Sequence, residues 1–85
     1  MKVKYIGASV GVDGLTNGQE YVCLGIEDDF LRIIDDSGED YLYPIDNPVA
    51  LNGGSGRWLI VEDTDSNILH FAMDKHTNHA IPRAV

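Results

Sequence analysis

The sequence has a single cysteine, few cations and no long hydrophobic run among its 85 residues. Cys23 stands alone, which excludes a disulfide within one chain. No segment approaches the ~20 apolar residues that a membrane-spanning helix needs, and the first residues lack the apolar stretch of a signal peptide. We therefore expect a cytoplasmic protein that does not bind membranes.

Cations are scarce and scattered. Lys and Arg number 6 against 14 Asp and Glu, which gives a formal net charge of −8. Nucleic-acid binding depends on clustered cations that displace counterions from phosphates. The charge balance argues against a nucleic-acid partner. It leaves open a basic partner, or an acidic protein that imitates nucleic acid.

Glycine and Asn-Gly pairs interrupt the chain at short intervals, and the runs between them are rich in Val, Ile, Leu and Tyr. A chain of this length forms one domain with a small core. Up to residue 61, no run keeps apolar residues at helical spacing for three turns, so short strands joined by turns fit better. We predict strands at residues 2–6, 19–27, 30–35, 40–45 and 57–62.

The segment after residue 63 has a different character. Residues 68–72, ILHFA, could form a sixth strand or a helical turn. The last thirteen residues show little periodicity and contain Pro82, so we expect a poorly ordered tail. The predicted organisation is one β domain at 1–63 and a C-terminal extension at 64–85.

Four acidic residues surround one glycine in DDSGED, residues 35–40. A Ca²⁺ loop of the EF-hand type needs Gly at its sixth position and Glu at its twelfth, and this segment fails that register. The residues instead suit a three-residue turn, 36–38, which avoids placing like charges opposite each other. This turn pairs Leu31 with Tyr43 and places Tyr41 on the same face. We expect its carboxylates to be solvated.

Five short strands with a long first loop and tight later hairpins have the outline of an SH3-like barrel. The segments KYIG, GLTNGQEYVCLGIED, FLRIIDDSGEDYLY and RWLIVED resemble small SH3-like proteins of Gram-positive bacteria and their phages. The resemblance covers residues 2–63. It implies an all-β fold, a small SH3-like barrel of five or six antiparallel strands, and it implies no catalytic residues. The tandem Trp pair and Pro-x-x-Tyr motif of eukaryotic peptide-binding SH3 domains are absent, so polyproline binding is not implied.

Aromatic residues are the candidates for a binding surface, because Tyr and Trp dominate binding hot spots. We select Tyr41, Tyr43 and Trp58. The competing interpretation is that these rings belong to the core, which is the commoner use of aromatics in a small domain.

Two further groups could carry chemistry. His70, His76 and His79, with Asp74, could supply zinc ligands, but structural zinc sites usually need four ligands and often use Cys pairs. Cys23 could act as a nucleophile, yet its neighbours are apolar and the nearest charges are acidic, which favours a buried structural thiol. We therefore expect no metal, no cofactor and no catalytic residue.

These patterns predict a non-enzymatic protein that binds an unidentified protein or peptide. The net charge of −8 supports an alternative, an acidic decoy from a mobile element that imitates nucleic acid. A third interpretation is a structural component of a phage or of an oligomer, since small barrels often keep an exposed edge strand.

Overall fold

The computed structural model describes residues 1–9 and 14–80, with the backbone only for residue 52 and residues 76–80. Most of its regular secondary structure is β-strand, with one short 3-10 turn and one α-helix. The elements are β1 (Lys2–Gly7), β2 (Glu20–Glu27), β3 (Phe30–Ile34), β4 (Asp40–Pro44), η1 (Ala50–Asn52), β5 (Gly56–Glu62) and α1 (Ile68–Ala80). All five predicted strands are confirmed, and each boundary lies within one residue of its predicted place.

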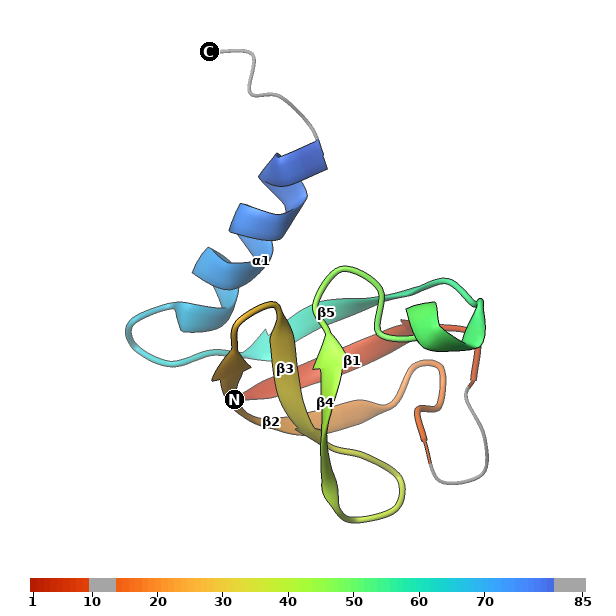
Figure 1. Ribbon diagram of the computed structural model, residues 1–85. Helices are drawn as coiled ribbons and strands as arrows, with labels where there is room; N and C mark the ends of the chain where they lie inside the picture. The colour runs from red at the N-terminus through yellow and green to blue at the C-terminus, as the bar shows by residue number, and fades with distance from the viewer. Residues whose placement is uncertain (10–13, 81–85) are drawn as a thin grey trace.

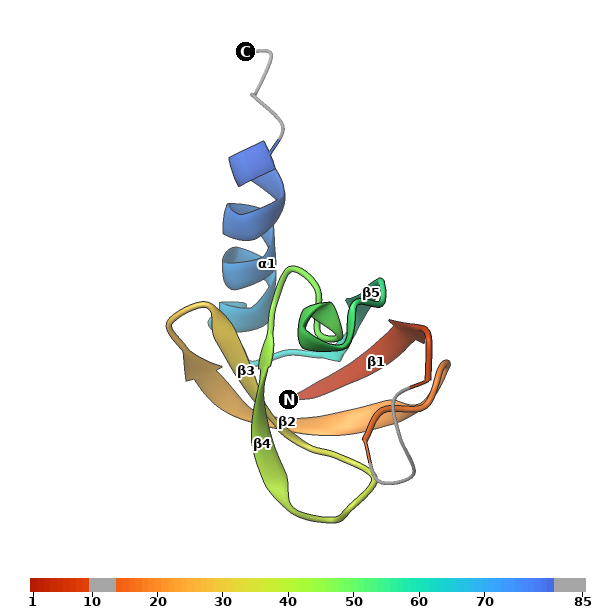
Figure 2. The ribbon, with the colours of Figure 1, turned by 45° about the vertical axis from the view of Figure 1, so that its right-hand side comes forward.

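The strands form one antiparallel sheet in the order β4-β3-β2-β1-β5, so β4 and β5 are its two edges. The sheet curves strongly, and β3 and β4 run across the direction of β1 and β5 (Figures 1 and 2). A register shift between Cys23 and Gly25 marks a bulge in β2, a feature that bends a strand. The curvature brings the two edges close to each other. Nε1 of Trp58 in β5 donates to the Pro44 carbonyl in β4 at 3.2 Å.

The acidic hairpin between β3 and β4 has the predicted register. Leu31 lies opposite Tyr43, and the Asp35 amide donates to the Glu39 carbonyl at 3.1 Å. Gly38 has a φ of 84°, in the left-handed region that glycine adopts most easily. The three-residue turn between Asp35 and Glu39 is therefore confirmed.

Alternate residues of the strands point to one side of the curved sheet and form the core. Tyr5, Leu31 and Ile33 are fully buried, and their sequence neighbours are exposed or half-buried. This alternation is the period-2 pattern expected of half-buried strands. The core consists of Val3, Tyr5, Leu15, Tyr21, Cys23, Leu31, Ile33, Ile45, Val49, Trp58 and Leu69.

Residues 68–72 form the start of helix α1, so for ILHFA the helical alternative holds and the sixth strand does not. The helix also includes residues 73–80, which were expected to belong to a poorly ordered tail. Leu69 is fully buried, and Ala72 and Met73 pack against the core, a spacing that belongs to one helical face. The apolar run 68–72 is too short for its period to be read from sequence. The remaining tail, 81–85, and residues 10–13 of the long first loop lie outside the described residues.

The carboxylate of Asp63 holds the start of α1. Its Oδ1 accepts the Leu69 amide at 3.0 Å, and its Oδ2 accepts the His70 amide at 2.9 Å and contacts His70 Nδ1 at 2.7 Å. First-turn amides have no partner within a helix, so this side chain satisfies two of them. Beyond this anchor the helix projects away from the sheet (Figures 1 and 2). Among the described residues, no helix combines the length and apolar character needed to cross a bilayer.

We predict that Gly56→Ala destabilises the protein by about 1–3 kcal/mol, because an added Cβ would lie 2.7 Å from the buried Tyr5 ring. Gly25→Ala is the matched control, since nothing lies within 4 Å of its Cβ position. Urea unfolding of both variants measures the difference. Equal midpoints would show that the approach of Tyr5 to the β5 backbone is not needed for stability.

Acid pH should weaken the anchor of α1. Burial alone would raise the pKa of Asp63, but the hydrogen bonds from Leu69, His70 and Thr64 outweigh it and hold the pKa well below its usual range. A carboxyl whose pKa is lowered by folding stabilises the protein above its unfolded-state pKa of about 4, and this stabilisation is lost as the pH falls further.

We therefore expect Asp63→Asn to cost about 1 kcal/mol at pH 7, the typical value of a helix-capping side chain. The difference from the wild type should shrink as the pH falls below about 4, the unfolded-state pKa. Urea unfolding at pH 7 and at a pH below about 4 measures this difference in the free energy of unfolding. The control is Asp65→Asn, which changes an exposed residue. A difference that is the same at both pH values would contradict the predicted role of the ionised carboxylate.

Candidate binding surface around Tyr41

Trp58 lies at the centre of an aromatic cluster. Its ring makes edge-on contacts with Tyr5, Tyr21 and Tyr43, at centroid distances of 5.7, 6.5 and 6.2 Å. Only 6% of Trp58 is exposed. The structure thus places Trp58 in the core, beneath Tyr43, and not on an exposed patch beside Tyr41.

Tyr43 is half-buried and is fixed by the acidic turn. Its hydroxyl donates to Asp35 Oδ2 at 2.6 Å. The pKa of Tyr43 is raised well above its usual range, mainly by burial and next by the hydrogen bond to the Asp35 carboxylate. The other oxygen of Asp35 accepts the amide of Ser37 at 3.0 Å and its hydroxyl at 2.5 Å. Asp35 is 7% exposed, so it is a buried acceptor whose two oxygens are both satisfied.

Asp36 connects the same turn to the loop before β2. Its Oδ1 accepts the Tyr21 hydroxyl at 2.8 Å, and its Oδ2 accepts the Thr16 hydroxyl at 2.8 Å. Its amide donates to the Gly14 carbonyl at 3.0 Å. The expectation that the carboxylates of this turn are solvated was therefore wrong for Asp35, which is buried, whereas Asp36 is exposed although both of its oxygens accept hydrogen bonds.

The sequence contained a signal for these hydrogen bonds. Tyr21 and Tyr43 occupy core-facing strand positions, and a buried tyrosine hydroxyl usually needs a hydrogen-bond partner. Carboxylates at the ends of neighbouring strands are suitable acceptors. Pairing each hydroxyl with its carboxylate nevertheless required the curvature of the sheet.

Tyr41 shares the face of Tyr43, as predicted, but its environment differs. It lies opposite Ile33 near the end of the sheet and is 51% exposed. Its strand, β4, is an edge of the sheet. Tyr43, two residues further along the same face of β4, is held by its hydrogen bond to Asp35. We call this exposed ring and the adjoining edge of β4 the Tyr41 surface.

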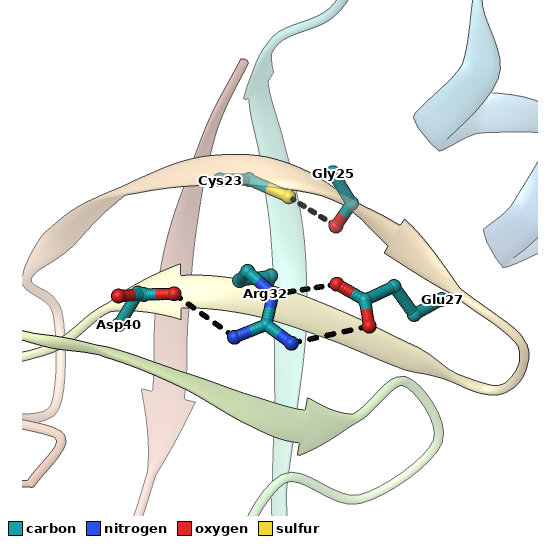
Figure 3. Close-up of polar contacts among 5 residues, drawn as sticks. All are labelled: Cys23, Gly25, Glu27, Arg32 and Asp40. Atoms are coloured by element: carbon teal, nitrogen blue, oxygen red, sulfur yellow. Dashed lines mark hydrogen bonds and ion pairs between the residues drawn. The ribbon is translucent and has the colours of Figure 1, made fainter.

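Arg32 lies on the opposite face of β3 and links three strands (Figure 3). Its Nε donates to Glu27 Oε2 at 2.5 Å, its Nη2 to Glu27 Oε1 at 3.1 Å, and its Nη1 to Asp40 Oδ2 at 2.9 Å. The hydrogen bond from Arg32 lowers the pKa of Glu27, and the two carboxylates raise the pKa of Arg32. These ion pairs connect partly exposed side chains of β2, β3 and β4.

Cys23 has the properties of a structural thiol. It is buried, and its Sγ donates to the Gly25 carbonyl at 3.4 Å (Figure 3). Burial raises the pKa of the thiol, which disfavours the thiolate that a nucleophile requires.

The histidines do not form a described metal site. His70 contacts Asp63 through Nδ1, and the side chains of His76 and His79 lie outside the described residues. In the part of the chain that the structure describes, no three metal-ligating side chains come together.

The chain has no match among protein-family models, curated proteins or solved structures.

Replacing either tyrosine by Phe distinguishes their roles. Tyr43→Phe removes the donor to the buried Asp35 and should destabilise the protein by about 1–3 kcal/mol. Tyr41→Phe should change the free energy of unfolding by less than about 0.5 kcal/mol, the usual range for a surface substitution. Thermal or urea unfolding of the two variants provides the comparison. If Tyr41→Phe were the more destabilising, the assignment of Tyr43 as the anchored ring would be contradicted.

Proposed function

We propose that the chain is a non-enzymatic protein-interaction module built on an SH3-like barrel, and that the Tyr41 surface contacts a protein or peptide partner. The observation that carries the proposal is the exposure of Tyr41. A large ring is 51% exposed on an edge strand, and Tyr43, on the same face of that strand, is held by its hydrogen bond to Asp35.

The arrangement of elements supports the barrel. Five short antiparallel strands, a long connection between β1 and β2 and tight later hairpins have the outline of an SH3-like fold. The sheet is open, but its edges lie close enough for the indole N–H of Trp58 to donate a hydrogen bond to the Pro44 carbonyl. Because folds of this kind serve many activities, the fold supports no particular partner.

The exposed ring of Tyr41 and the ordered Tyr43 on the same strand face favour binding for a physical reason. Aromatic residues that dock into a partner dominate binding energy, and surfaces that are ordered before binding lose less conformational entropy. An edge strand also offers unpaired backbone groups to an extended segment of a partner. The Tyr41 surface combines these two features.

The decoy alternative finds less support. A protein that imitates nucleic acid needs an extended band of exposed carboxylates, whereas several carboxylates of this chain satisfy internal donors. Those with internal donors include Glu27, Asp35, Asp36, Asp40 and Asp63. The use of carboxylates in the fold therefore favours the interaction module.

We expect Tyr41→Ala to weaken capture of the partner at least tenfold while the protein stays folded, because truncation of an aromatic hot spot costs about 2 kcal/mol or more. The experiment is affinity capture from a cell lysate, followed by titration of the partner identified. The matched control is Leu24→Ala, a 54% exposed residue of β2 outside the Tyr41 surface.

A partner held equally by wild type and Tyr41→Ala would place the contact elsewhere on the chain. A partner lost equally with Leu24→Ala would show a general effect on folding. A wild-type protein that captures no specific partner would contradict the interaction module.

A further inference from the structure

A groove of about 200 Å³ lies between α1 and the turn that joins β2 to β3. Its lining combines apolar side chains with charges of both signs. The lining residues are Ile26, Asp28, Asp29, Ile68, Phe71, Ala72 and Lys75. Neither the acidic hairpin of β3 and β4 nor the Tyr41 surface contributes to it.

Phe71 is the most prominent apolar group beside this groove and is 74% exposed. With Ile68, Ala72 and Lys75 it lies at the i, i+3, i+4, i+7 spacing of one helical face. A second face, which includes Leu69, packs on the core. A helix of this length is marginal in water without packing. The exposed face of α1 therefore gains stability if another surface covers it.

We propose that a second copy of this chain covers the groove, in a symmetric dimer formed by α1 and the β2–β3 turn. The surface contains both halves of a self-complementary contact. Phe71 protrudes, and the apolar groove beside it can accept the Phe71 of the other copy. Such two-fold interfaces, in which the same patch serves both partners, are the commonest in soluble oligomers.

The charged side chains that line the groove are also self-complementary. Asp28 and Asp29 lie on the turn, and Lys75 lies one helical turn after Phe71. When two antiparallel helices cross at Phe71, each Lys75 lies beside the first turn of the other helix. That first turn is the part of α1 nearest the β2–β3 turn (Figures 1 and 2). Each lysine is then placed near the acidic turn of the other copy. A partner of one charge sign would match either the aspartates or the lysine, but not both.

A contact confined to one helix face and one turn is small, so we expect a weak dimer, with a dissociation constant in the micromolar range of about 1–100 µM.

Sedimentation velocity of the full-length chain over a concentration series tests the proposal. The wild type should change from monomer to dimer as its concentration rises. Phe71→Asp should remain monomeric. Leu51→Asp, which changes a 95% exposed residue outside the groove, should associate like the wild type. Circular dichroism would establish that each variant is folded.

A charge exchange tests the geometry. Lys75→Asp and Asp28→Lys should each weaken the dimer at least fivefold, and the double variant should recover to within about threefold of the wild type, since opposite charges face each other again. The proposal is overturned if the wild type remains monomeric throughout the series, if Leu51→Asp disrupts association as strongly as Phe71→Asp, or if the double variant is weaker than both single ones. A monomeric wild type that binds a different protein through Phe71 would assign the groove to that protein.

Discussion

The contacts of Trp58 hold the two edges of this sheet together. Its ring meets three tyrosines, and its indole N–H reaches from β5 to the Pro44 carbonyl of β4. A domain of this size buries a smaller share of its surface than a large domain does, so a few large rings supply much of its stability. Gly56 permits the arrangement, because a side chain at this position would collide with Tyr5. An open sheet is thereby fixed in a strongly curved form without strand pairing between its edges.

Carboxylates provide the second constraint. The hydroxyls of buried tyrosines need acceptors, and Asp35 and Asp36 supply them from one turn. Asp63 has the corresponding role for the amides at the start of α1. Part of the acidity of this chain is thus built into its fold, which reduces what is available for imitation of nucleic acid. The hydrogen bond to Asp35 also holds Tyr43, which lies two residues from Tyr41 on the same face of β4.

Two exposed surfaces of the described residues are proposed to bind other molecules. The Tyr41 surface lies on the edge strand β4, and the groove with Phe71 lies between α1 and the β2–β3 turn. Because they share no residue, the proposed partner binding and the proposed dimer can be tested separately. A dimer through α1 would carry two Tyr41 surfaces, and two linked sites bind a multivalent partner more tightly than either site alone.

The sequence by itself determined the five strands and the register of the acidic hairpin, because strand alternation and turn chemistry are local properties. It also placed Tyr41 and Tyr43 on one face. Only the tertiary structure decided which of the two rings stays exposed, that Trp58 belongs to the core, and which carboxylates serve as acceptors. Those outcomes depend on residues that the sheet's curvature brings together from distant parts of the chain. Helix α1 also depends on tertiary contacts, since the sequence ILHFA fits the period of a strand or of a helix. The helix is stabilised by the burial of Leu69 in the core and by Asp63, which caps its first turn.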